Sequence, residues 1–210
     1  MARKTKEEAQ ETRHLILDAA QKEFSEKGVA HTSLHDIARR ANLTRGAIYW
    51  HFKNKADLFN AMLDRVILPM EEFVDHANQS SDEDPIGFVR ACALQVMYKL
   101  THEAQTQEVF EIIKHKVELT GDMLPAKTRH LKGRNDCIQN IQSALATASD
   151  KALLKPGTDT AQAAIGLHCL IDGLISNWVL DPGAFNLEKQ AHFCINQYID
   201  SLLTHQTEQA

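Results

Sequence analysis

The stretch that decides the fold is TSLHDIARRANLTRGAIYWHF, residues 32–52. It contains two short amphipathic segments separated by Asn42-Leu43. Ser33, followed three residues later by Asp36, forms a capping box that predicts the start of the first helix. Thr44 can cap a second, very short helix that ends near His51. Two helices joined by a turn of this length, with an earlier helix packed behind them, predict a helix-turn-helix.

The second of these segments carries residue types that suit contact with DNA. In a helix-turn-helix the second helix enters the major groove, and Arg45 stands at its N-terminal end, where side chains reach base edges. An arginine fork can bond O6 and N7 of guanine, and Gly46 would let the backbone approach closely. Neighbouring polar groups could reach phosphates, which set the register. The predicted DNA contacts are Thr32, Ser33, Thr44, Arg45, Gly46, Tyr49, Trp50, His51 and Lys55.

Packing offers a second interpretation for some of these side chains. Ile48 and Phe52 are expected inside the fold. Tyr49 and Trp50 could pack as well, although adjacent helical residues face in different directions, so at least one must leave the core. His51 could simply cap the short helix. A structural use is hard to find for an arginine on a short polar face, which favours the functional interpretation of Arg45.

The charge distribution agrees with a DNA-binding head. The chain has 210 residues and a formal net charge of −5. Residues 1–55 nevertheless hold 11 basic and 7 acidic side chains, whereas the remainder holds 12 and 21. A basic head on an acidic body indicates that only the head meets a polyanion. A chance fluctuation among solvated helix faces would give the same numbers, so the charge alone does not settle the question.

Helical spacing continues through the rest of the chain. Leu15, Ile16, Ala19, Ala20 and Phe24 predict a helix that Gly28 ends. Later apolar stripes predict further helices, and strict alternation typical of strands is absent from the sequence. We therefore predict an all-α fold with a helix-turn-helix domain at residues 1–55 and a helical ligand-binding and dimerisation domain at residues 56–210.

The sequence TSLHDIARRANLTRGAIYWHFKNKADLF, residues 32–59, resembles the DNA-binding signature of the TetR family of bacterial repressors. With the opening ARKTKEEAQETRHLILDAA, it is similar to the branch typified by AcrR, the local repressors of multidrug efflux pumps. The likeness is specific over about the first 65 residues, and it is looser beyond, where IDGLISNWVLDPGAFNLEK resembles a late helical segment. The resemblance implies a repressor of an efflux operon, with Arg45, Tyr49, His51, Lys55 and Thr32 on DNA.

Two late segments predict a homodimer. The segment TAQAAIGLHCLIDGLISNWVL, residues 160–180, is apolar on nearly all sides, so several faces must be covered. A bundle with residues 187–204 and with a second copy of both helices would cover them. A two-fold dimer would also present two recognition helices to a palindromic operator.

The body also predicts an apolar effector pocket with few polar points. Asp172 is the odd residue in its apolar run, where a carboxylate needs a partner. It could anchor an effector, or it could form a structural bond to a cap, to Asn177 or across the dimer. Each apolar candidate could equally belong to a plain core. The predicted pocket residues are Val66, Met70, Val96, Phe110, Lys114, Arg134, Cys137, Ile138, Ile141, His168, Ile171, Asp172, Ile175 and Trp178.

Other classes of protein are less favoured by the sequence. Glu111, His115 and Glu118 share a helix face, but a di-metal bundle needs Glu-x-x-His twice, so we expect no metal or other cofactor. Neither a nucleophile elbow nor a phosphate-binding glycine loop is present, so we expect no enzyme. The N-terminus lacks a secretion signal and four cysteines lack paired spacing, which predicts a cytoplasmic protein outside any membrane.

Three alternatives stay open at this point. The nearest is a regulator of the same architecture that responds to a fatty-acyl compound or another metabolite. The second is an all-α enzyme built on the Glu111, His115 and Glu118 face. The third is a helical interaction protein whose basic head binds acidic partners.

Overall fold

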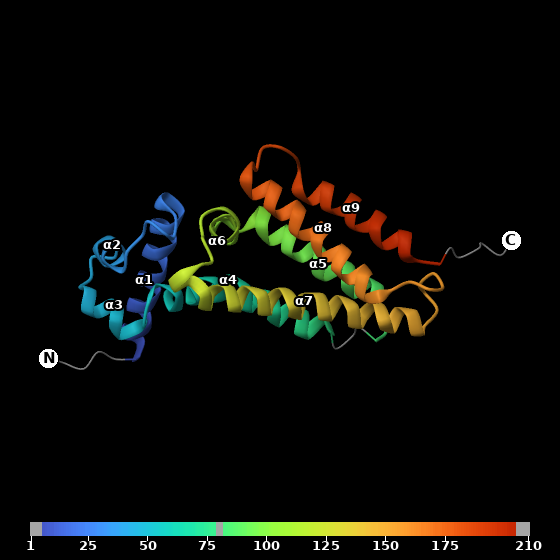
Figure 1. Cartoon of the computed structure of the whole chain (residues 1–210), viewed down its shortest axis with the longest axis horizontal. Coiled ribbons are helices and arrows are strands. Elements are labelled where there is room, and N and C mark those ends of the chain that lie inside the picture. The colour runs from blue at the N-terminus through green and yellow to red at the C-terminus, as the bar shows by residue number, and fades with distance from the viewer. Residues whose placement is uncertain (1–5, 79–81, 205–210) are drawn as a thin grey trace. The chain divides into compact units, whose positions relative to one another are not determined.

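The computed structural model describes residues 6–78 and 82–204. Every regular element in this part of the chain is helical, which confirms the predicted all-α class, and β-structure there is limited to an isolated bridge between Leu154 and Leu203. The elements are α1 (Lys6–Lys27), α2 (Leu34–Arg40), α3 (Arg45–His51), α4 (Lys55–Asn78), α5 (Pro85–His102), α6 (Ala104–His115), the 3₁₀ helix η1 (Gly121–Met123), α7 (Leu124–Asp150), α8 (Thr160–Leu180) and α9 (Leu187–Leu202). Figure 1 labels the α-helices.

The helices gather into two compact units that are not consecutive in sequence. The first contains the described residues up to Leu68 together with Gln105–Leu131, and the second contains Pro69–Ala104 and the described residues from Lys132 onward. The predicted domain boundary between residues 55 and 56 lies inside the first unit, at the start of α4. The helix-turn-helix therefore shares a compact unit with α6, which follows it in the chain by about fifty residues.

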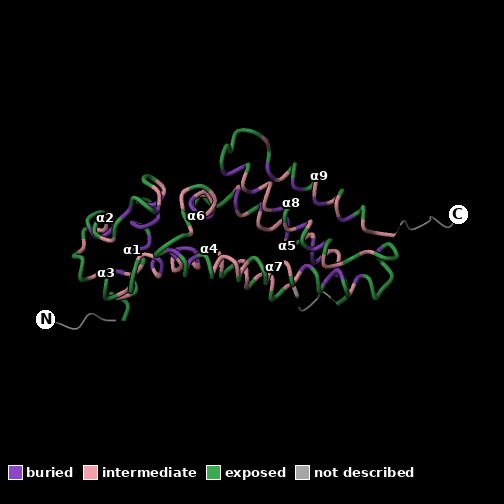
Figure 2. Tube along the Cα trace, in the orientation of Figure 1, coloured by how far each residue is buried: buried purple, intermediate pink, exposed green. Residues whose placement is uncertain are grey.

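An apolar core beneath α1 organises the first unit. Ile16, Phe24, Ile37 and Ile48 are completely buried, and they come from α1, α2 and α3 (Figure 2). Phe24 meets Phe59 of α4 edge to face, with ring centroids 5.9 Å apart. This is a favoured aromatic geometry. The three helices of the predicted motif and the first turns of α4 are thus fixed against one another.

The second unit is built around α5, α8 and α9. Ala164, Leu167 and Ile195 are completely buried, and Ile171, Ile175 and other buried residues continue the α8 stripe. Arg90 of α5 donates a hydrogen bond to Asn196 of α9 at 2.6 Å, which fixes one helix along the other. Thr101 and Glu188 form a second link between the same helices, at 2.7 Å.

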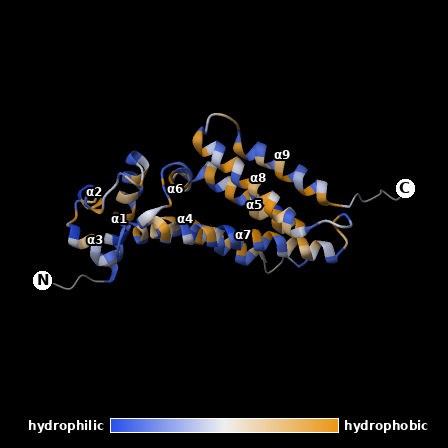
Figure 3. Ribbon diagram, in the orientation of Figure 1, coloured by the Kyte–Doolittle hydropathy of each residue, from blue (hydrophilic) through white to orange (hydrophobic). Residues whose placement is uncertain are grey.

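The helix α8 is apolar over most of its surface (Figure 3). In the described part of the chain it is the one helix long and apolar enough to cross a membrane by length and composition. Core helices of globular proteins pass the same test, and α8 packs against α9 along one side. Its Ile165 and Leu180 are exposed in the single chain. The folded chain therefore leaves part of the apolar surface of α8 uncovered, in agreement with the expectation from its sequence.

A close approach at Gly166 sets the packing of α9 on α8. The Tyr198 hydroxyl donates a hydrogen bond to the carbonyl oxygen of Ala163 at 2.9 Å. A Cβ atom at position 166 would lie 2.3 Å from that hydroxyl oxygen, so the phenol ring occupies the space that a side chain would take.

We predict that Gly166→Ala lowers the free energy of unfolding by about 1–3 kcal/mol, because the added methyl group overpacks the contact. The intrinsic helix preference for alanine offsets part of this loss, by roughly 1 kcal/mol. Urea unfolding followed by circular dichroism measures the difference. Gly46→Ala is the matched control, because its nearest neighbour atom is 3.8 Å away and we expect no loss there. An equal loss from both substitutions would contradict the packing argument.

Candidate nucleic-acid interface

The turn between α2 and α3 has the predicted local structure. Ser33 and Asp36 form the reciprocal capping box: the Asp36 amide donates to Ser33 Oγ at 3.2 Å, and the Ser33 amide donates to Asp36 Oδ2 at 3.0 Å. The Ser33 hydroxyl, which donates to Asp36 Oδ2 at 2.5 Å, and the Ser33 amide together hold the pKa of the Asp36 carboxyl below its usual value. Thr44 caps α3 by accepting from the Ala47 amide at 3.3 Å. Asn42 adopts a left-handed conformation with φ 54°, which asparagine tolerates and which ends α2 sharply.

The short helix α3 separates a buried face from an exposed one. Ile48 and Phe52 are buried, as expected, whereas 47% of Tyr49 and 71% of Trp50 are exposed. Both aromatic rings have therefore left the core of the chain. The Trp50 ring meets the His51 ring edge to face at 4.5 Å. A large apolar side chain kept in water on a small polar helix marks a contact surface.

Arg45 is exposed beside Tyr49, one helical turn along α3. Its Nη2 donates a hydrogen bond to the Tyr49 hydroxyl oxygen at 3.0 Å, and the guanidinium carbon lies 5.3 Å from the centre of the phenol ring. The exposed face thus joins a cation, two aromatic rings and an imidazole within one turn and a half of helix. That combination suits a groove with phosphate walls and base edges.

Two predicted DNA contacts have structural uses instead. Thr32 is 1% exposed, and its hydroxyl donates to the carbonyl oxygens of Gly28 at 2.8 Å and Glu23 at 3.2 Å. The Lys55 ammonium donates to the carbonyl oxygens of Val29 at 2.7 Å and Thr32 at 3.1 Å. In the chain by itself the polar atoms of both side chains are thus bonded to backbone carbonyls. From the sequence alone, a hydroxyl or ammonium group suits a phosphate oxygen as well as it suits a backbone carbonyl oxygen.

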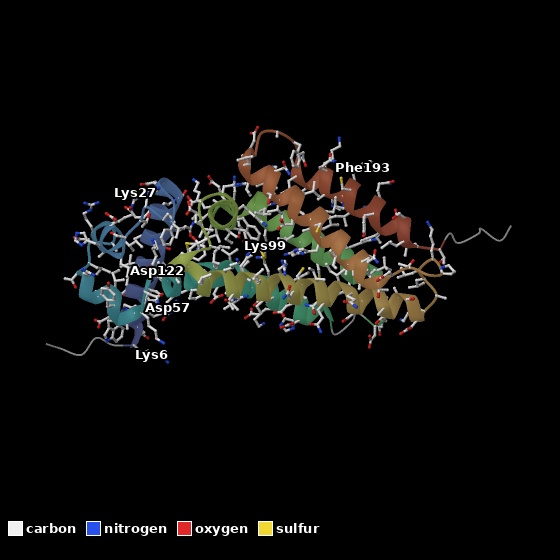
Figure 4. All side chains as sticks on the ribbon, in the orientation of Figure 1. Lys6, Lys27, Asp57, Lys99, Asp122 and Phe193 are labelled. Carbon is white, nitrogen blue, oxygen red and sulfur yellow. The ribbon has the colours of Figure 1, made fainter. Side chains whose placement is uncertain are left out.

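Burial lowers the pKa of the Lys55 ammonium, and the charge of Asp122 opposes this effect. Asp122 lies in η1, between α6 and α7, and is labelled in Figure 4. The first residue of α4 is therefore attached to the connection between α1 and α2, and it also feels a charge from the segment that follows α6. A motif read from residues 32–52 alone gives no signal of this arrangement.

A partly buried ion-pair network fixes α2 on α1. The carboxylate of Glu23 accepts from Lys27 and Arg40 at 2.5 and 2.6 Å, and Arg40 also donates to Glu26. Burial by itself would raise the pKa of Glu23, but the bonds from Lys27 and Arg40 outweigh it and lower the pKa. Arg40 thereby crosses from the middle of the motif to the supporting helix, and α2 cannot slide without breaking these bonds.

The helix α6 attaches to the same supporting helix. The Lys116 carbonyl accepts from the Val29 amide at 2.8 Å, and the Lys116 ammonium donates to the Ser25 carbonyl at 2.6 Å. Glu108 of α6 accepts from Gln21 and pairs with Lys22 of α1 at 2.5 Å. The sequence gives no signal for the roles of Lys116 and Glu108, because their partners lie about 90 residues away in the chain.

The predicted effector-pocket residues are divided between the two units. Val66, Phe110 and Lys114 belong to the first unit, and the other residues belong to the second. Arg134 is exposed, and its guanidinium donates to Asn135 of its own helix at 2.9 Å. The remaining members are buried (Val66, Ile141, Ile171, Ile175 and Trp178), half-buried (Met70, Val96, Phe110, Lys114, Ile138, His168 and Asp172) or reached by solvent (Cys137).

Two cysteines, Cys92 of α5 and Cys137 of α7, have thiols whose pKa is raised. Cys137 is accessible to solvent, yet surrounding protein atoms raise the pKa of its thiol. Burial raises the pKa of Cys92 to about 11, with a smaller contribution from the charge of Cys137. Neither thiol lines either of the two hollows described for the second unit. Cys92 was absent from the predicted pocket, since a lone thiol in an apolar stripe gives no signal.

Two open hollows of the second unit involve other residues. One, of about 500 Å³, lies on α8 and α9 and is lined by Cys169, Leu170, Gly173, Leu174, Asn177, Phe185 and Gln190. The other, of about 340 Å³, is lined by Phe73, Ala91, Leu94, Gln95, Met97, Tyr98, Glu188 and His192. Neither contains a predicted pocket residue. Within residues 6–78 and 82–204 we found no cluster of three or more His, Cys, Asp or Glu suited to a metal ion.

Comparison with known proteins matches both halves of the chain. Residues 16–62 match the family described as bacterial regulatory proteins of the tetR family, and residues 84–204 match the C-terminal region of MAATS-type transcriptional repressors. The HTH-type transcriptional regulator TtgR of Pseudomonas putida is 42% identical over 206 residues, which cover 96% of each chain.

Two solved structures are similar over almost their full length. NalD, the secondary repressor of the MexAB-OprM multidrug efflux pump in Pseudomonas aeruginosa, has a TM-score of 0.85 at 35% identity, covering 94% of this chain and 99% of that chain. SmeT, the repressor of the Stenotrophomonas maltophilia multidrug efflux pump SmeDEF, is similar in its complex with triclosan. That structure has a TM-score of 0.81 at 28% identity, covering 93% of both chains.

We predict that Lys55→Met lowers the free energy of unfolding by about 1–3 kcal/mol, because it removes the donor to the Thr32 carbonyl and the shorter of the two bonds to the Val29 carbonyl. The slope of log affinity for DNA against log salt concentration should not change. A lysine on a phosphate would reduce that slope by roughly one when removed. Urea unfolding and a salt titration of DNA binding measure the two quantities. An unchanged stability with a reduced slope would restore Lys55 to the DNA contacts.

Proposed function

Because the chain belongs to the TetR family of bacterial regulatory proteins, we propose that it is a ligand-responsive repressor of a multidrug efflux operon. The observation that carries DNA binding is the exposed face of α3, where Arg45, Tyr49 and Trp50 stand outside a fully formed helix-turn-helix. The assignment to an efflux operon is supported by the relatives, since NalD and SmeT are both described as repressors of such pumps.

The proposed DNA surface is smaller than the set expected from the sequence. Arg45 reads a base edge, and Tyr49, Trp50 and His51 contact the groove wall or phosphates. Ser33, Thr44 and Gly46 contribute the N-terminal ends of α2 and α3, where amide groups and exposed backbone suit a phosphate. Thr32 and Lys55 support this surface from inside, because their polar atoms are bonded to backbone carbonyls.

A second copy of the chain is proposed to cover α8 and α9. Leu180 and Phe193 are 68% and 63% exposed, and Figure 4 labels Phe193 on α9. The groove of about 500 Å³ on α8 and α9 has an apolar floor that a symmetry-related helix can fill. A two-fold dimer places its recognition helices on two half-sites roughly 34–36 Å apart, so we expect a palindromic operator.

The effector is proposed to be a lipophilic compound bound inside the body. The buried apolar side chains of the body, among them Ile141, Ile171 and Ile175, support this proposal. Triclosan, which is bound in the SmeT structure, is the first compound to test. In this mechanism the effector binds best to a state in which the heads do not fit the operator, so binding releases DNA.

We predict that the protein binds duplexes from the intergenic region beside its own gene more tightly than shuffled duplexes. The preference should persist when salt is raised from about 0.05 to 0.2 M, where binding by phosphate contacts alone collapses. Arg45→Ala should reduce the preference by roughly 5–150-fold, the range of one bidentate base contact. Fluorescence anisotropy measures both affinities.

The matched control for this experiment is Lys132→Ala, which also removes one exposed positive charge but lies on α7, paired with Asp136. We expect it to leave the preference unchanged. Equal, salt-sensitive binding to native and shuffled duplexes would refute a sequence-specific regulator and would favour the interaction-protein alternative.

We predict that triclosan lowers operator affinity by roughly 5–150-fold, the usual range for coupling between two sites. Anisotropy with a fixed operator and increasing triclosan measures the effect, and calorimetry measures binding of triclosan without DNA. A fatty-acyl compound is tested in parallel. Release by the acyl compound alone would favour a metabolic regulator, and tight binding of triclosan with unchanged operator affinity would contradict the proposed mechanism.

A further inference from the structure

The pairing of Arg45 with Tyr49 is already formed without DNA. The two residues are four positions apart on α3, so their side chains lie on the same helix face. One hydrogen bond of 3.0 Å and one cation–π contact of 5.3 Å join the guanidinium to the same phenol group. An exposed arginine normally loses much rotamer freedom when it binds. Here two contacts restrict the guanidinium before DNA arrives.

The hydrogen-bonding capacity of both groups leaves room for DNA. Arg45 Nη2 carries two hydrogens, and the bond to Tyr49 uses one of them. The other hydrogen of Nη2 and those of Nη1 remain for O6 and N7 of a guanine. The Tyr49 oxygen accepts from Arg45, so its own O–H hydrogen can be donated to a phosphate oxygen. Bonds arranged in such a chain polarise and strengthen one another.

We propose that Tyr49 is a positioning residue that aims Arg45 at one guanine in each operator half-site and links this base contact to a neighbouring phosphate. The inference rests on the proposed function, and it adds the base that is read and the residue that orients the reader. Tyr49 is then more than a phosphate contact. Its hydroxyl determines how strongly the protein distinguishes guanine from other bases.

The test uses a guanine analogue that lacks one acceptor. The operator is first obtained by selection from a random duplex pool with the full-length protein. Each guanine is then replaced in turn by 7-deazaguanine, which keeps O6 and lacks N7. For the unmodified protein we expect about a five- to tenfold loss of affinity at one guanine of each half-site, in line with half of a bidentate contact. Arg45→Ala should abolish that loss.

Tyr49→Phe is the decisive variant, since it keeps the ring and removes only the hydroxyl. We expect it to bind the operator more weakly and to shrink the 7-deazaguanine loss to about twofold, because a mobile guanidinium bonds N7 less often. Tyr98→Phe makes the same chemical change on α5, at a side chain that is also half exposed (50%). Tyr98→Phe should show the same loss of affinity on the 7-deazaguanine operator as the unmodified protein. Circular dichroism of each variant confirms that the helices are intact.

Three results would overturn the inference. In the first, Tyr49→Phe weakens binding to the guanine operator and to the 7-deazaguanine operator by the same factor. The hydroxyl would then serve only as a phosphate contact. In the second, Arg45→Ala retains the loss, so that another residue reads the guanine. In the third, the selected operator contains no guanine sensitive to 7-deaza substitution. Each of these results can be obtained only if the protein binds one operator specifically, so each overturns the role of Tyr49 and leaves the proposed function standing. If the selection enriches no sequence, the proposed function itself is refuted.

Discussion

The connection between α1 and α2 is the part of the first unit on which the rest depends. Carbonyl groups at the end of a helix and in the following turn lack helical partners, and buried carbonyls need a donor. Gly28 turns the chain with φ 78°. The Lys55 ammonium of α4 then donates to the Val29 carbonyl, while Lys116 after α6 accepts from the Val29 amide and donates to the Ser25 carbonyl in the last turns of α1. One short turn thus fixes the helix-turn-helix to both α4 and α6.

This arrangement explains why α3 can be so short and so exposed. A seven-residue helix is unstable by itself, because few hydrogen bonds offset the cost of ordering it. Ile48 and Phe52 bind it to the core, Thr44 caps its start, and the guanidinium of Arg13 lies 5.2 Å from the Phe52 ring. Because these contacts stabilise α3, Tyr49 and Trp50 can remain exposed to solvent. The same division separates supporting polar groups, such as Thr32, from those that can meet DNA.

The second unit handles apolar surface differently. Its α8 helix buries one stripe, packs against α9 and leaves Ile165 and Leu180 in contact with solvent. Such exposure on a helix of this composition is typical of an interface that a second subunit covers. Several predicted effector-pocket residues, such as Val96 and Ile138, lie on other elements of this unit, α5 and α7. Dimerisation and effector binding are thereby proposed for different parts of one helical bundle.

Local patterns in the sequence determined the helices, the capping box at Ser33, the cap at Thr44 and the buried side of α3, because these features depend on neighbours within four or five residues. They also gave the exposed Arg45. Tertiary structure alone decided that Lys55 and Thr32 bond backbone carbonyls, that Lys116 and Glu108 bind α1, and that α6 joins the DNA-binding unit. Ammonium, hydroxyl and carboxylate groups have the same chemistry at the surface and inside, and only the folded chain determines which partner, phosphate or carbonyl, is within reach.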